Sequence, residues 1–182
     1  MIIRLRRQQV KATDKQFFIA EDLPRKVDEA NVKKEKKAGN LKVVWISRIA
    51  PKKNLKYAIE ILEETKSDIE FTIYGPAHTE EYWKECKQEL RKLPSNVKWE
   101  WKGNLDSESV VETLKHYHVF LFPTLGENFG HVIQEALSAG CPCIISDQTP
   151  WRDFESQGVG YVFSLENKSA FVNAVEKYAV MK

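Results

Sequence analysis

Short apolar runs alternate with helical segments over most of this chain, and that alternation limits the fold more than any other feature of the sequence. Each run is three to six residues long, which suits a buried strand better than a helix. Such alternation is typical of βαβ units, so the sequence predicts an α/β fold with a doubly wound, parallel, Rossmann-like sheet. Strands are expected at residues 43–46, 69–74, 97–101, 119–122, 142–145 and 161–163, and helices at 55–62, 79–92, 106–117, 128–138, shortly after 150 and at 168–180.

Residues 121–147 read LFPTLGENFGHVIQEALSAGCPCIISD and carry two carboxylates, Glu127 and Glu135. If a helix begins near Asn128, the two carboxylates are separated by about 12 Å along its axis. That separation is too large for an acid/base pair acting on one bond, and it suits two contacts to an elongated ligand. The amides of residues 129–131 lie between them at the helix N-terminus, where an anion is favoured. A phosphate with a polyol on either side describes a nucleotide sugar.

Two cations follow the first predicted strand. Arg48 comes at its carboxyl end, and Lys53 comes five residues later, near a helix start. Ligands of doubly wound sheets bind beyond the carboxyl ends of the strands. Cations in these positions can clamp a diphosphate from two sides, whereas Lys52 is interpreted as a surface residue.

The block from Glu127 to Glu135 has the E-x7-E pattern, and the segments PTLGENFG, EALSAGCPCIISD and TPW flank it in order. Together they resemble the retaining glycosyltransferases of the GT-B fold, specifically family 4. The resemblance covers about residues 40–180, which correspond to the donor-binding C-terminal half of such enzymes. It implies hexosyl transfer from a nucleotide-diphosphate sugar to a glycan or lipid-linked acceptor. Polysaccharide or lipopolysaccharide biosynthesis in the cytoplasm is the implied setting, with peripheral membrane association of the full enzyme.

The resemblance also implies roles for individual residues. Arg48 and Lys53 contact the donor phosphates, Glu127 binds the donor sugar, and Glu135 binds the ribose hydroxyls. Catalysis is expected to depend on Glu127, Arg48 and Lys53. Gly75 is expected near the donor, and Gly103 and Asn104 near the nucleobase, with plain turns as the alternative for all three. Packing or surface roles remain alternatives for the aromatic residues of the loop. The further donor-binding candidates are Gly75, Gly103, Asn104, Phe129, Gly130 and His131.

Neither a metal nor a cofactor is expected beyond the donor substrate. The sequence has no Asp-x-Asp, the motif that holds a metal-bound diphosphate in the other large glycosyltransferase fold. His116 and His118 would share one face of a strand, but no acidic or cysteine partner is near them in the sequence. The three cysteines lack zinc-site spacing and are expected to be buried in a reducing compartment.

Residues 1–40 are expected to be a linker or N-terminal extension, and residues 41–182 a nucleotide-sugar-binding domain. Within the extension, residues 1–12 suggest an amphipathic helix and residues 17–20 a strand. Residues 1–53 hold 15 Lys+Arg against 6 Asp+Glu, a basic balance that a nucleic acid or a membrane surface would also attract. Solvated linker lysines explain it better, and no aromatic-interleaved basic pattern supports nucleic-acid binding.

Two functional hypotheses follow, and a third is disfavoured. In the first, the chain is the donor half of a glycosyltransferase and is inactive alone, because the acceptor site lies in the preceding half of such enzymes. In the second, it is a non-catalytic nucleotide-sugar-binding module that acts with a partner chain. A dinucleotide enzyme or receiver domain is disfavoured, because neither a Gly-x-Gly-x-x-Gly nor an acidic cluster adjoins the first strand.

Overall fold

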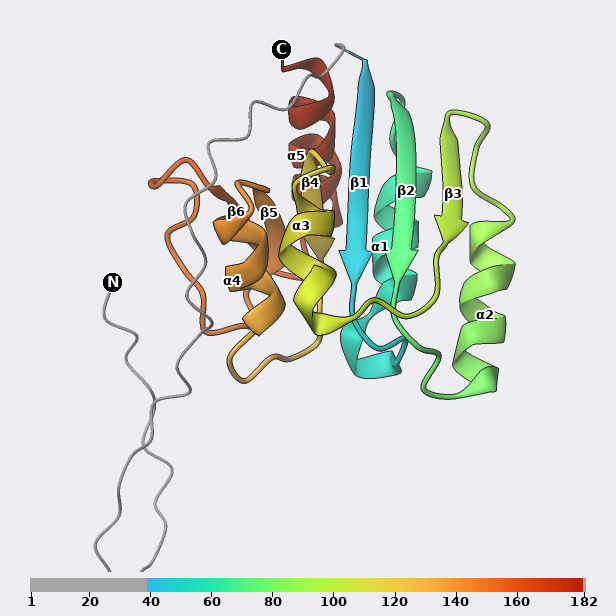
Figure 1. Cartoon of the computed structure of the whole chain (residues 1–182). Helices are drawn as coiled ribbons and strands as arrows, with labels where there is room; N and C mark the ends of the chain where they lie inside the picture. The colour runs from blue at the N-terminus through green and yellow to red at the C-terminus, as the bar shows by residue number, and fades with distance from the viewer. Residues whose placement is uncertain (1–38, 182) are drawn as a thin grey trace, which may run out of the picture.

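The computed structural model describes residues 39–181, which form one six-stranded sheet. All neighbouring strands are parallel, and their order is β3-β2-β1-β4-β5-β6. The predicted doubly wound, Rossmann-like fold is therefore confirmed (Figure 1). The helix expected at 1–12 and the strand expected at 17–20 lie outside the described residues. The strands are β1 (Asn40–Ile46), β2 (Asp68–Tyr74), β3 (Val97–Trp101), β4 (Val119–Phe122), β5 (Cys143–Ser146) and β6 (Gly160–Phe163).

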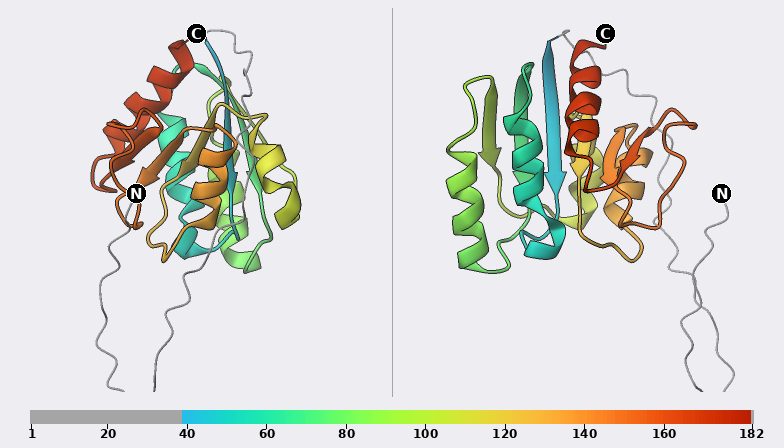
Figure 2. Two further views of the ribbon diagram at one scale, coloured as in Figure 1. Left: turned by 60° about the vertical axis from the view of Figure 1, so that its left-hand side comes forward. Right: turned by 180° about the vertical axis from the view of Figure 1, so that it is seen from behind.

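Helices cover both faces of the sheet (Figures 1 and 2). One face carries α1 (Leu55–Glu63), α2 (Glu80–Leu90) and α5 (Lys168–Val180), and the other carries α3 (Val110–Leu114) and α4 (His131–Ser138). Two 3-10 turns, Pro51–Lys53 and Ser107–Ser109, precede α1 and α3. No helix within residues 39–181 combines the length and apolarity that a membrane-spanning segment needs.

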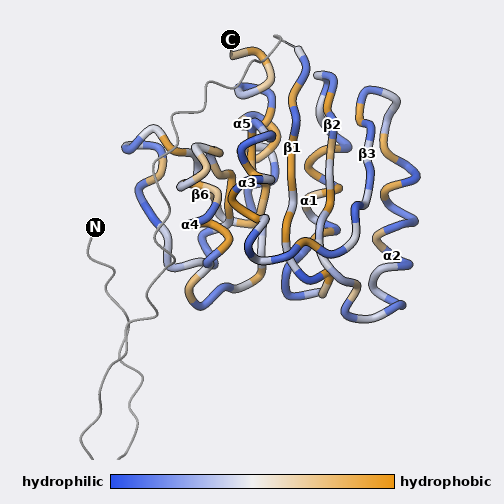
Figure 3. Tube along the Cα trace, viewed as in Figure 1, coloured by the Kyte–Doolittle hydropathy of each residue, from blue (hydrophilic) through white to orange (hydrophobic). Residues whose placement is uncertain are grey.

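Uniformly apolar strands form the centre because a strand covered on both faces has no solvent side. All four residues of β4 and all four of β5 are buried, and Figure 3 shows the apolar colour along the neighbouring central strand β1. The outer strand β3 differs, since only Val97 of its five residues is buried. Thr79 caps α2 by accepting a hydrogen bond from the Tyr82 amide, as the predicted helix start requires.

Two sequence predictions about helices are wrong. The helix expected shortly after Pro150 is absent: residues 154–158 form hydrogen-bonded turns, and Asp153 takes a left-handed conformation (φ 61°) that interrupts helical geometry. The helix expected at 106–117 is shorter, since a 3-10 turn occupies Ser107–Ser109 and α3 ends at Leu114. The amides of His116 and Tyr117 instead bond to carbonyls three residues back, which closes the helix early and turns the chain toward β4.

The strand order places a topological switch point between β1 and β4. After β1 the chain crosses to α1 on one face, and after β4 it crosses to α4 on the other. The loops after β1 and β4 therefore lie at the carboxyl edge where the strand order reverses, which is where ligands of doubly wound proteins bind.

Candidate functional site

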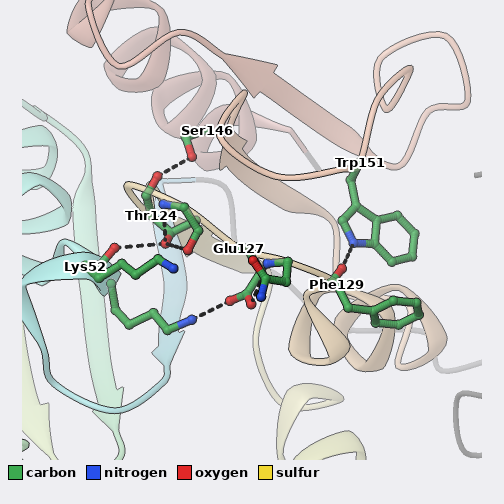
Figure 4. Close-up of polar contacts among 9 residues, drawn as sticks. Lys52, Thr124, Glu127, Phe129, Ser146 and Trp151 are labelled. Carbon is green, nitrogen blue, oxygen red and sulfur yellow. Dashed lines mark hydrogen bonds and ion pairs between the residues drawn. The ribbon is translucent and has the colours of Figure 1, made fainter. Parts of the chain in front are cut away.

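A buried threonine joins the two loops at the switch point. Thr124 follows β4, is fully buried, and donates its hydroxyl to the Lys52 carbonyl (3.0 Å) and the Gly126 carbonyl (3.2 Å). The same hydroxyl accepts from the Gly126 amide, while Ser146 Oγ donates to the Thr124 carbonyl (2.5 Å) (Figure 4). Asn54 adds a second link by donating its side-chain amide to the Pro123 carbonyl (2.9 Å). These bonds hold the loops after β1, β4 and β5 in one arrangement.

Lys53 and Glu127 meet across this junction. Lys53 Nζ lies 2.5 Å from Glu127 Oε2, and the two side chains are 16% and 18% exposed. The ammonium also lies over the Phe122 ring, 5.7 Å from its centroid. Glu127 Oε1 accepts from the Asn128 amide, and the Glu127 amide donates to the Gln148 carbonyl. A cation predicted to face phosphate and a carboxylate predicted to face sugar are thus adjacent, although 74 residues separate them.

The start of α4 differs from the sequence prediction. The helix begins at His131, not near Asn128, and Gly130 precedes it with φ 80°. The positive φ favours glycine at position 130, and a Cβ there would also crowd Ile133 Cδ1 (2.8 Å) and Trp151 Nε1 (3.1 Å). The helical rise of about 1.5 Å per residue therefore does not apply between Glu127 and Gly130, and the separation of about 12 Å predicted between Glu127 and Glu135 no longer follows. Glu135 lies one turn into α4.

Trp151 fixes the loop before α4. Its indole N–H donates to the Phe129 carbonyl (2.7 Å), and the side chain is only 6% exposed (Figure 4). The Phe129 ring is partly buried and contacts the exposed His131 ring, with centroids 4.5 Å apart. Amides in the first turn of a helix have no intrahelical acceptor. Trp151 therefore positions the amides at the α4 N-terminus, which the sequence assigned to phosphate binding.

The other predicted residues lie on the same edge of the sheet. Arg48 is exposed in the loop after β1, and Glu135 is partly buried on α4. Gly75 follows β2 with φ 125°, and a Cβ there would lie 1.8 Å from the Ser47 carbonyl oxygen. Glycine at position 75 is thus required by the close approach of β1, whereas the sequence suggested approach to a ligand. The Gly75 amide donates to the Gly103 carbonyl (2.7 Å), and Asn104 is exposed beside it.

Within residues 39–181 no group of three or more His, Cys, Asp or Glu side chains could hold a metal ion. His116 and His118 precede β4 in a turn rather than sharing a strand face, and His118 Nδ1 accepts from the Lys42 amide (3.0 Å). All three cysteines are buried, and burial raises the pKa of the Cys86 thiol to about 11. These cysteines pack as small apolar residues.

Sequence reasoning missed the residues that build the scaffold of the site. Thr124 was not singled out, although a polar residue directly after a fully apolar strand is a detectable signal. Asn54 was not singled out either, although asparagine tolerates the left-handed conformation it adopts here (φ 58°). Trp151, the last residue of the TPW segment, was assigned no role of its own; its hydrogen bond to the Phe129 carbonyl depends on tertiary structure alone.

The fold is that of the doubly wound α/β proteins, and it matches the structures of GT-B glycosyltransferases. The chain belongs to the family of glycosyl transferases group 1, whose model matches residues 26–179. This finding confirms the resemblance at the level of that family and makes the chain part of a transferase family.

Individual relatives are similar over part of their length. A GDP-Man:Man(3)GlcNAc(2)-PP-Dol alpha-1,2-mannosyltransferase of Caenorhabditis elegans is 26% identical over 137 residues, which are 67% of this chain and 29% of the relative. The apo structure of the lipopolysaccharide outer core galactosyltransferase WaaB superposes with a TM-score of 0.69 at 20% identity, over 86% of this chain and 44% of that protein. Anabaena HepE, solved with UDP and glucose, gives a TM-score of 0.64 at 20% identity, over 76% and 38%. This chain therefore spans less than half the length of each.

Proposed function

We propose that this chain is the donor-binding, C-terminal half of a retaining glycosyltransferase of family 4. It binds a nucleotide-diphosphate sugar, without a metal ion, for transfer of the sugar to a glycan or lipid-linked acceptor. The observation that carries the proposal is the Lys53–Glu127 contact at the switch point, which joins a phosphate-binding cation to a sugar-binding carboxylate. HepE and TarM, two similar structures, were solved with UDP, which supports a nucleotide-sugar donor.

The roles of the residues follow from charge and position. Arg48, Lys53 and the amides at the α4 N-terminus neutralise the diphosphate, whose charge grows as the sugar departs. Glu127 accepts hydrogen bonds from sugar hydroxyls, and Glu135 accepts them from the ribose, since an ionised carboxylate only accepts. Gly103 and Asn104 lie at the end of β3, where the base is expected.

The chain is proposed to be inactive alone and to act in the cytoplasm on polysaccharide or lipopolysaccharide precursors. The acceptor side is assigned to a separate domain, because the chain spans 44% of WaaB and 29% of the mannosyltransferase. Peripheral association with a membrane is proposed for the full enzyme, which includes the acceptor domain.

Calorimetric titration with UDP, GDP, ADP and their sugar conjugates tests the donor site. Titrations are run in EDTA and then in Mg²⁺, on the unmodified chain, on Glu135→Ala and on Glu166→Ala, a control at an exposed site after β6. We expect one diphosphate to bind in EDTA, with affinity reduced about tenfold to a hundredfold by Glu135→Ala and unchanged by the control. No binding by a folded chain, or equal binding by Glu135→Ala, contradicts the proposal.

The second candidate is a non-catalytic nucleotide-sugar-binding module that works with a partner chain. The chain covers only part of the length of each relative, and this fits the module as well as it fits the enzyme. Both candidates bind the donor. Sugar transfer after addition of an N-terminal acceptor domain supports the enzyme, whereas donor binding without transfer supports the module.

A further inference from the structure

The open edge of the sheet at β3 has an unusual sequence. Its five residues read Val-Lys-Trp-Glu-Trp, with Trp99 in the middle, Lys98 before it and Glu100 after it. Reversing the direction of this strand about Trp99 places Lys98 opposite Glu100 and Val97 opposite Trp101. The strand is therefore complementary to a second copy of itself in antiparallel orientation.

The outward-facing backbone groups of β3 are placed so that they can pair with a reversed copy of the strand. The Asn96 carbonyl accepts from the Ile69 amide of the β2 side, and the Lys102 amide donates to the Ile73 carbonyl. Because backbone groups alternate between the two sides of a strand, the odd-numbered residues turn theirs outward. The N–H and C=O of Trp99 thus point away from β2. Trp99 facing its own copy makes a hydrogen-bonded pair on a two-fold axis, the symmetry of most homodimers.

The side chains add complementarity on both faces. Trp99 and Trp101 lie on the α2 face of the strand; they are 36% and 42% exposed, and Trp101 packs against Trp83 with centroids 5.0 Å apart. Lys98 and Glu100 lie on the other face and are exposed; Glu100 already pairs with Lys102 Nζ at 2.9 Å. Across a two-fold axis at Trp99, Lys98 of each copy meets Glu100 of the other, the two Trp99 side chains meet each other, and each Trp101 lies opposite Val97.

The edge is also accessible. Among residues 39–181, β3 has only β2 as a strand neighbour, and α2 lies toward the carboxyl end of β3 in both the front and back views (Figures 1 and 2). Exposed edges are usually protected against such pairing by short strands, charged side chains, prolines or bulges. β3 has five residues and carries Lys98 and Glu100, but it contains no proline, and its opposite charges attract a reversed copy. The other edge strand, β6, carries no charged residue and lacks this pattern.

We propose that β3 is a homodimerisation edge, at which two copies of this chain pair in antiparallel register centred on Trp99 to form a continuous twelve-stranded sheet. The inference rests on the edge strand alone and is independent of donor binding.

Charge reversal tests the proposal without removing Trp99. Sedimentation velocity over a range of concentrations measures dimerisation of the full chain, Lys98→Glu, Glu100→Lys, the double variant, and Glu166→Lys as a control of equal charge change. Each single reversal creates two like-charge cross-strand pairs and is expected to weaken the dimer about tenfold or more. The double variant restores opposite pairs and is expected to recover most of that loss, while the control leaves the dimer unchanged. Melting temperatures confirm that each variant is folded.

Cysteine cross-linking tests the register. In a hydrogen-bonded antiparallel pair the two Cα atoms are about 5.5 Å apart, within the range for a disulfide. Trp99→Cys should therefore cross-link to its own copy under mild oxidation. Trp101→Cys should not, because its copies lie about 13 Å apart along the strands. The native cysteines are buried and do not compete.

A chain that stays monomeric to about millimolar concentration overturns the proposal. A dimer whose dissociation constant does not change with the charge reversals also overturns it, because such a dimer uses another surface. Cross-linking of Trp101→Cys in preference to Trp99→Cys refutes the register. If β3 instead pairs with a segment of the same chain, the protein is a monomer and neither cysteine variant forms cross-links.

Discussion

The ion pair between Lys53 and Glu127 makes a quantitative prediction about stability. Fully exposed pairs are worth about 0–1 kcal/mol, and breaking a fully buried pair costs about 3–5 kcal/mol. With exposed fractions of 16% and 18%, this pair lies between those limits. We expect Lys53→Met and Glu127→Gln each to lower the free energy of unfolding by about 2 kcal/mol, because each leaves the other charge partly desolvated and without its counter-charge.

The double variant separates the pair from other effects. Methionine retains the aliphatic stem that packs near Phe122, and glutamine retains a carbonyl for the Asn128 amide. Since both single changes break the same interaction, the double variant is expected to lose about 2 kcal/mol rather than about 4, a coupling of about 2 kcal/mol.

Urea denaturation monitored by tryptophan fluorescence measures all four free energies. A loss of about 2 kcal/mol also corresponds to a fall of about 4–8 °C in the melting temperature of a chain of this size. Lys52→Met, on the exposed neighbour of Lys53, is the matched control and should change stability by less than about 0.5 kcal/mol. Additive losses in the double variant would refute the interpretation of Lys53 and Glu127 as a coupled, partly buried pair.

Two further predictions concern buried hydroxyls. Thr124→Val keeps the volume of the side chain but removes the hydroxyl that bonds Lys52 and Gly126, so it should cost about 1–3 kcal/mol, whereas Thr124→Ser should cost less; equal losses in urea denaturation would contradict this. Burial raises the pKa of Tyr178 to about 12. Because the folded state holds this proton more tightly than the unfolded state, stability is intact below about pH 10 and falls as the pH rises toward 12. Tyr178→Phe should lose less stability between pH 9 and about 11.5, and an unchanged slope would count against the assignment.

Much of the fold is predictable from the sequence because parallel strands covered on both faces must be apolar along their whole length. That rule located the four residues of β4 within the chain, and 3.6-residue periodicity located α5 at its observed limits. The same local patterns brought Glu127 and Glu135 into one unit and indicated a glycosyltransferase, which the match to glycosyl transferases group 1 over residues 26–179 confirms.

Tertiary structure decided the rest. The order of the strands follows from how six strands share one core, and local sequence carries no information about it. The contact between Lys53 and Glu127 depends on β1 lying beside β4. The start of α4 was predicted three residues too early, because Asn128 and Phe129 have ordinary propensities, while the hydrogen bond from Trp151 and the conformation of Gly130 hold the chain out of the helix.

The sequence by itself determined the strands, most of the helices and the residue types that follow them, since burial and periodicity are local properties of the chain. Only the tertiary structure decided which of those residues meet, because the loops after β1, β4 and β5 are joined by bonds between residues far apart in sequence, such as those of Thr124 with Lys52 and Ser146. The switch point exists only in the assembled sheet.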